Sequence, residues 1–293
     1  MDQQTKTLIG CFSEIGVGFL VLILNGFVLF RFVLKHNGFT KHFKMLFLKM
    51  TFDTAFVVAD MVYDGFIILN IYDLLTDIPF ICYPGIIAQA FLALLGFVSL
   101  AIAIDRLVAI LKPIKYNIRY AQIIHKSLLS ILCVVFLTNS VVLMLARNEN
   151  TEKSYSASKY FNVDIVYIVD NCSRVAFMLS FAVTLAFLFQ FYHFLKRHQM
   201  GTRAHLKNVK LASTTVILHM IAEILFIICP FITERIIYYV TKKTISHFVG
   251  RFSSLVHVLY VAVCSFMLFA IMKKNRVVHS LGTITHNASS TAI

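Results

Sequence analysis

The chain of 293 residues is 59% hydrophobic and only 14% charged, with a mean hydropathy of +0.79 and a net charge of +13. Soluble chains are typically about 45–50% apolar and about 25% charged, so this composition indicates a membrane protein. Seven apolar stretches, each of the roughly 20 residues that a bilayer requires, take up most of the length. The loops leave no room for a soluble catalytic or nucleic-acid-binding domain, so we expect neither an enzyme nor a nucleic-acid partner. The six cysteines form no CxxC or Cys/His cluster, and we expect no metal and no cofactor.

The apolar stretches predict an all-α membrane protein, a seven-transmembrane helix bundle forming a single domain over residues 1–293. The expected spans cover residues 8–34, 45–72, 82–111, 127–146, 174–195, 211–233 and 252–272. The first stretch is longer than the apolar region of a signal peptide and no small-residue cleavage site follows it, so we expect it to be retained. Residues 273–293 form a short tail.

Lysine and arginine are distributed unevenly between the two sides of the membrane. Of the 27, seventeen fall in one alternating set of segments and nine in the other, while Lys49 lies inside the second span. The basic set contains a single acid, Asp105, whereas eight acids lie on the opposite side. Because cytoplasmic loops carry the excess of basic residues, we predict an N-terminus outside and a C-terminus in the cytoplasm.

The end of the third span carries the most informative motif, in the segment from residue 105 to residue 116. An acid and an arginine alone at a helix end would be explained by the arginine snorkelling to lipid phosphates. The whole segment, however, resembles the DRYxAIxxPxxY signature of rhodopsin-like G-protein-coupled receptors, with leucine in place of the first tyrosine. The matching residues are Asp105, Arg106, Ala109, Ile110, Pro113 and Tyr116. The resemblance implies that Asp105 restrains Arg106 at rest and that Arg106 contacts a heterotrimeric G protein on activation.

Other positions agree with this family or depart from it. Asn25 resembles the polar residue of its first helix, and Asp53 lies where its second-helix aspartate is expected. The sixth span has a proline at residue 230 without the usual tryptophan, and the seventh span lacks NPxxY. These departures are similar to the nematode serpentine chemoreceptors, classes BC and X above all. The resemblance implies a chemosensory receptor for a small odorant or metabolite, placed in the plasma membrane of a sensory-neuron cilium.

Two of the six cysteines are placed where a disulfide could form on the outer side. Cys82 opens the third span on the outer side, and Cys172 is the only cysteine of the predicted second outer loop. We expect a disulfide between them, which the oxidising extracellular compartment permits. Two free thiols are the alternative.

Several polar residues fall inside the spans, where their cost makes them functional candidates. Asp53, Asp60 and Asp64 share one face of the second helix, and Lys49 either pairs with Asp53 or snorkels to the headgroups. The candidates for a ligand pocket nearer the outside are Asp64, Gln89, His257 and Tyr260. Structural hydrogen bonds between helices are the alternative explanation for each.

A secondary transporter is the competing function. In that case the aspartates of the second helix would form an ion path across the membrane. Transporters of this kind are typically built from internal repeats with broken helices. We find no such repeat in the sequence, and the receptor remains the favoured hypothesis.

Overall fold

The structure, a computed structural model, describes residues 3–34, 44–74, 81–112, 115–116, 120–147, 161–197, 214–215, 217–242 and 252–270. Within these ranges, seven helices are long and apolar enough to cross a membrane, as the sequence predicted. A helix satisfies its own backbone hydrogen bonds, which the hydrocarbon core of a bilayer cannot do. The chain is therefore a multi-pass membrane protein.

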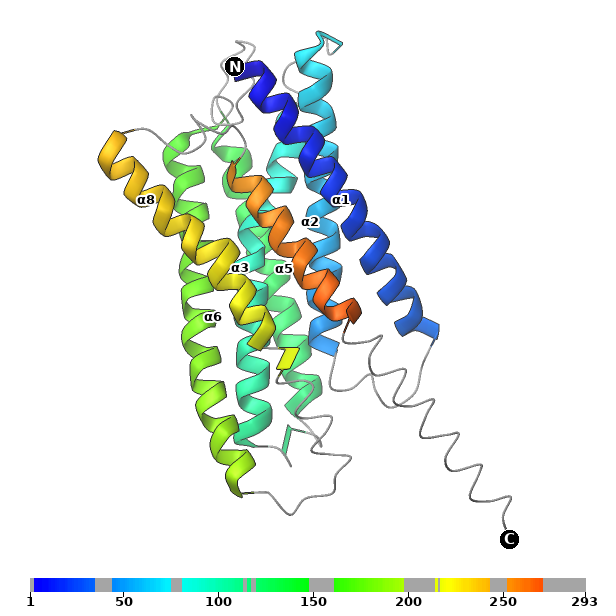
Figure 1. Cartoon of the computed structure of the whole chain (residues 1–293), viewed down its shortest axis with the longest axis vertical. Helices are drawn as coiled ribbons and strands as arrows, with labels where there is room; N and C mark the ends of the chain where they lie inside the picture. Colours follow the sequence, from blue (N-terminus) through cyan, green and yellow to red (C-terminus); the bar gives the residue numbers. More distant parts are fainter. Residues whose placement is uncertain are drawn as a thin grey trace.

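The helices run up and down through one bundle (Figure 1). The first five spanning helices are α1 (Gln3–Leu34), α2 (Lys44–Ile71), α3 (Cys82–Leu111), α5 (Ala121–Leu145) and α6 (Val163–Arg197). The sixth helix covers residues 217–241 and includes the π-helical turn η5 (Ile224–Ile228) and α8 (Cys229–Thr241). The seventh helix covers residues 252–270. We call the end at which α1 begins the upper end and the opposite end, where α3 finishes, the lower end.

Helix α3 is the most buried of the seven and holds the centre of the bundle. It packs against α2, α5 and α6, and a larger share of its residues is buried than in any other spanning helix. At Gly96 a Cβ atom would overlap the backbone oxygen of Ser173 in α6. Small residues allow helices in membranes to approach closely, and Gly96 serves this purpose between α3 and α6.

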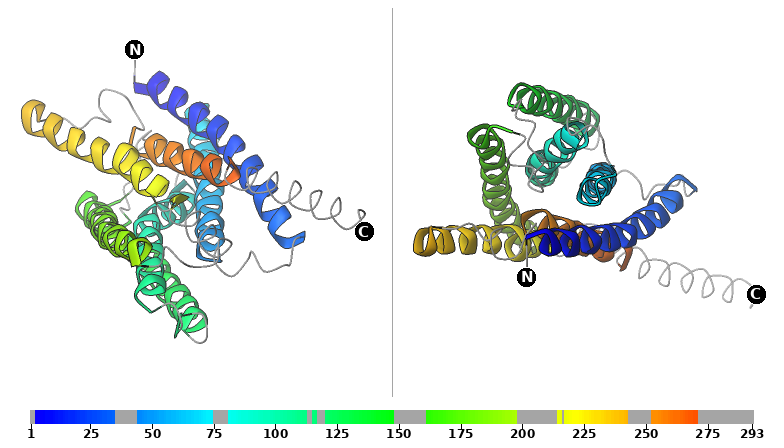
Figure 2. Two further views of the ribbon diagram at one scale, coloured as in Figure 1. Left: turned by 60° about the horizontal axis from the view of Figure 1, so that its bottom comes forward. Right: turned by 90° about the horizontal axis from the view of Figure 1, so that it is seen from above.

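The sixth helix changes geometry near its middle. Pro230 has no N–H to donate, and its ring crowds the carbonyl four residues earlier in an α-helix. The π-helical turn η5 ends two residues before this proline, where it accommodates the disruption. Beyond it, α8 has no buried residue, and its upper end points away from the other helices (Figures 1 and 2).

Several helices extend past the expected spans. Helix α6 begins eleven residues before residue 174, because Asn162 caps it by accepting a hydrogen bond from the backbone N–H of Asp164 at 3.0 Å. The sixth helix continues eight residues past 233, and α5 begins six residues before 127. Hydropathy marks where a chain crosses the membrane, whereas a helix continues for as long as its backbone groups find partners.

Candidate functional site

The lower end of α3 carries a buried acid that several side chains approach. Asp105 is 1% exposed, and its Oδ1 accepts a hydrogen bond from the Tyr116 hydroxyl at 2.6 Å. Nε2 of His125, in α5, lies 3.5 Å from the same oxygen. Nε of Arg106 lies 3.9 Å from Oδ2, which is an ion pair too long for a hydrogen bond. We call these four residues the lower cluster.

The environment of the lower cluster keeps Tyr116 in its neutral form. Burial, and then the negative charge of Asp105, raise the pKa of Tyr116 well above its ordinary value of 10. The phenol therefore retains its proton at neutral pH. It remains a hydrogen-bond donor to Asp105 over the whole physiological range.

Three of the residues that the motif singled out lie together in the lower cluster: Asp105, Arg106 and Tyr116. Pro113 lies outside the described residues. His125 was not identified from the sequence, because a single histidine in a basic segment carries no pattern of its own. Only the packing of α5 beside α3 brings it to Asp105.

Asn25 and Asp53, the other two predicted switch residues, lie away from the lower cluster. Nδ2 of Asn25 donates to Oγ1 of Thr54, which joins α1 to α2 at 2.9 Å. Asp53 pairs with Lys49 four residues earlier, at 2.6 Å, with both side chains 4% exposed. Of the two possibilities for Lys49, the structure therefore shows the ion pair rather than a side chain that reaches the headgroups.

This ion pair belongs to a polar network in the middle of the bundle. Nζ of Lys49 lies 4.8 Å from the ring centroid of Tyr260, whose hydroxyl is 3.3 Å from Oγ of Ser99. Glu223 of the sixth helix is buried and interacts electrostatically with Lys49. We call Lys49, Asp53, Ser99, Glu223 and Tyr260 the central network. Because its members come from α2, α3 and the sixth and seventh helices, a rotation of any of these helices changes its interactions.

A third polar group lies near the upper end. Nε2 of Gln89, in α3, donates to Oδ1 of Asp170 in α6 at 2.5 Å. Arg174, one turn further along α6, interacts electrostatically with Asp170 and with His257 of the seventh helix. Nη2 of Arg174 also lies 3.5 Å from Oε2 of Glu234 in α8. These five residues, which we call the upper cluster, bring four helices together around one arginine.

The four predicted pocket residues are distributed over three places. Gln89 and His257 belong to the upper cluster, Tyr260 belongs to the central network, and Asp64 lies in a separate group of acids. The three charged residues of the upper cluster, Asp170, Arg174 and Glu234, were not identified as site residues from the sequence. Hydropathy placed Asp170 and Glu234 in outer loops and Arg174 at the first residue of a span, whereas all three lie within longer helices.

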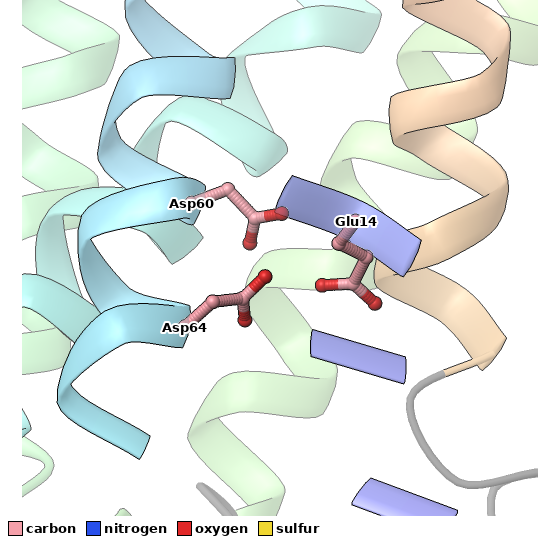
Figure 3. A group of neighbouring side chains, drawn as sticks. All are labelled: Glu14, Asp60 and Asp64. Carbon is pink, nitrogen blue, oxygen red and sulfur yellow. The ribbon is translucent and has the colours of Figure 1, made fainter. Parts of the chain in front are cut away.

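Three buried carboxylates converge between α1 and α2 (Figure 3). The carboxylate oxygens of Glu14, Asp60 and Asp64 lie within 4.8 Å of one another. Oγ of Ser254, in the seventh helix, donates to both oxygens of Asp60 at 3.0 and 3.1 Å. Three ionised carboxylates this close would repel one another strongly in a medium of low dielectric constant, so protons or a cation must neutralise the group. Oxygen ligands of this kind suit a hard cation.

Only part of this acidic group was predicted from the sequence. It placed Asp60 and Asp64 on one helix face together with Asp53, but Asp53 instead pairs with Lys49. Glu14 was missed, although a glutamate inside an apolar span is itself a signal.

The expected disulfide between Cys82 and Cys172 requires a correction. Both cysteines are free thiols in the structure. Cys172 lies within α6 rather than in a loop and is exposed, whereas Cys82 is buried at the start of α3. A helical backbone fixes the direction of the Cys172 side chain, so the freedom that a loop would give it to reach Cys82 is lost.

Comparisons with known proteins add no family to these observations. No protein-family model matches the chain, and no curated protein matches its sequence significantly.

Proposed function

We propose that this protein is a receptor that binds a small ligand at its upper end and activates a heterotrimeric G protein at its lower end. The observation that carries the proposal is the lower cluster, in which Arg106 and Tyr116 of the signature motif meet at Asp105. The excess of lysine and arginine in the segments that follow α1, α3 and α6 supports a cytoplasmic location for the lower end.

In this proposal, Asp105 restrains Arg106 while the receptor is at rest. The separation of 3.9 Å means that the restraint is an attraction between charges without a hydrogen bond, which contacts with a G protein can replace. Tyr116 and His125 hold the carboxylate in place, because both approach the same oxygen. Release of Arg106 then requires that α3 and its neighbours move relative to one another.

The central network provides the connection between the two ends. It joins α2, α3 and the sixth and seventh helices, so a ligand that repositions one of them alters the buried interactions of the others. A ligand shifts this equilibrium only by as much as it binds the active arrangement more tightly. The π-helical turn before Pro230 supports the sixth helix as the element that bends.

The proposed biological role is chemosensation. The motif at the end of α3, with the altered sixth and seventh helices, supports a receptor of the nematode serpentine type, class BC or class X. Its ligand would be a small odorant or metabolite, and its location the plasma membrane of a sensory-neuron cilium.

Guanine-nucleotide exchange tests this proposal directly. Membranes that contain surface-verified protein are exposed to pooled odorants and water-soluble metabolites, and exchange on an added G protein is measured. Arg106→Glu should retain surface expression and lose the response. Lys126→Glu, an equal change of charge at an exposed position of α5 near the same end, should keep it. A full response from Arg106→Glu would remove the assigned role of this arginine.

The acidic group supports a second candidate, an ion-coupled transporter. Three buried carboxylates from two helices offer the kind of site at which transporters bind protons or cations. Cation flux into proteoliposomes, measured for the native protein and for Asp64→Asn, separates the two functions. Flux that the variant abolishes, without any nucleotide exchange, would favour the transporter.

A further inference from the structure

Two arginines at the upper ends of α6 and α8 have contrasting surroundings. Arg174 lies beside two acids, Asp170 and Glu234. Arg235 follows Glu234 in α8 and has only neutral polar partners among the described residues. Nη2 of Arg235 lies 3.4 Å from Oδ1 of Asn171, in α6. Among the residues that the structure describes, the charge of Arg174 is therefore compensated by acids, whereas Arg235 makes no ion pair.

Aromatic rings hold the Arg235 guanidinium from two helices. Its Cζ lies 4.9 Å from the ring centroid of Tyr167 in α6 and 5.2 Å from that of Phe231 in α8. A guanidinium is planar and has five N–H donors around its edge, so rings against its faces leave edge donors for a ligand. Carboxylates and phosphates are the groups that match this edge.

Arg235 lies close to the upper end of the bundle. It lies six residues before the end of α8, and Tyr167 lies four residues after the start of α6. At 1.5 Å per residue, both are within about 10 Å of the upper ends of their helices. Tyr167 is 45% exposed, and Arg235 is partly exposed.

We propose that Arg235, framed by Tyr167, Phe231 and Asn171, binds the acidic group of the receptor's soluble ligand, a carboxylate or a phosphate. The inference rests on the proposed function, because it assigns the chemical class of the ligand. It predicts that agonists are organic acids or phosphorylated metabolites. An anion bound there would join α6 to α8, whose upper end has no buried residue of its own.

A fluorescence experiment tests the site without any G protein. The chain contains no tryptophan, so Phe231→Trp introduces a single reporter, which lies beside the guanidinium groups of both Arg235 and Arg174. The purified variant in a neutral, phosphate-free detergent is titrated with benzoate or inorganic phosphate, with chloride keeping the ionic strength constant. We expect a saturable change in emission. Arg235→Gln in the same background should weaken the apparent affinity at least tenfold, since a charge-assisted hydrogen bond is lost.

A matched control separates the site from a general effect of charge. Lys242→Gln removes another cation from the upper end of α8, one that lies over the Tyr239 ring, and should leave the titration unchanged. An equal response from the Arg235→Gln and native backgrounds, or no saturable response to either anion, would overturn the proposal.

A lipid headgroup is the other source of the same chemistry. Nanodiscs of phosphatidylcholine alone and with phosphatidylglycerol provide that arm of the test. An emission change that requires phosphatidylglycerol and that soluble anions do not produce would overturn the assignment to a ligand. Because the titration reports binding alone, saturable binding without nucleotide exchange would contradict the proposed signalling function rather than the site.

Discussion

Removing either member of the buried Lys49–Asp53 pair should destabilise the protein far more than removing both. The two atoms are 2.6 Å apart and each side chain is 4% exposed, so a single substitution leaves one charge in a medium of low dielectric constant. Breaking a buried pair in this way typically costs about 3–5 kcal/mol, whereas replacing both partners with apolar residues is close to neutral. Lys49→Met and Asp53→Leu should therefore each cost several kcal/mol, and the double variant much less than their sum.

The free energy of unfolding in mixed micelles, measured by titration with a denaturing detergent, gives the coupling between the two sites. We expect a coupling of about 3 kcal/mol or more from this double-mutant cycle. The Arg174–Glu234 pair is a suitable control, since it is longer at 3.5 Å and its side chains are 19% and 25% exposed. Its coupling should stay below about 1 kcal/mol. Additive effects at Lys49 and Asp53 would refute the reasoning, because they would mean that the two charges are stabilised independently.

Three further predictions concern packing, hydrogen bonding and capping. Gly96→Ala should cost about 1–3 kcal/mol in thermal unfolding, because its Cβ meets the Ser173 backbone; unchanged stability would mean that α3 and α6 separate easily. Tyr116→Phe should cost about 1–3 kcal/mol by leaving a buried oxygen of Asp105 without this donor. Because the pKa of Tyr116 is raised on folding, its contribution should be constant below about pH 10 and fall at higher pH, and a loss already at pH 8 would contradict this. Asn162→Ala should lower the unfolding free energy by about 0.5–2 kcal/mol, whereas Asn162→Asp, which preserves the cap, should not.

Much of the lower cluster could be predicted because its members are close in the chain. Asp105 and Arg106 are adjacent, and Tyr116 follows within the same motif, so local sequence was enough to bring them under one hypothesis.

The ion pair of the central network is also local. Lys49 and Asp53 are four residues apart on one helix, which places them as neighbours on its surface. Their pairing was accordingly one of the two outcomes that the sequence allowed.

Contacts between helices could not be predicted in the same way. Glu14 joins Asp60 and Asp64 from a different helix, and Gln89 meets Asp170 across 81 positions of the chain. These contacts depend on how each helix is rotated and tilted about its neighbours. Hydropathy says little about rotation in a membrane, since lipid is as apolar as the faces that pack together.

The sequence by itself determined that this protein crosses the membrane seven times, because burying unsatisfied backbone groups in lipid is so costly that only helices of sufficient apolar length can form there. It did not determine where the helices end in water, as α6 shows by starting at its Asn162 cap. Nor did it determine which polar side chains meet, or that Cys172 lies within a helix and not in a loop. The tertiary structure decided these features, because they arise from close packing around α3, where a residue as small as Gly96 sets the distance between helices.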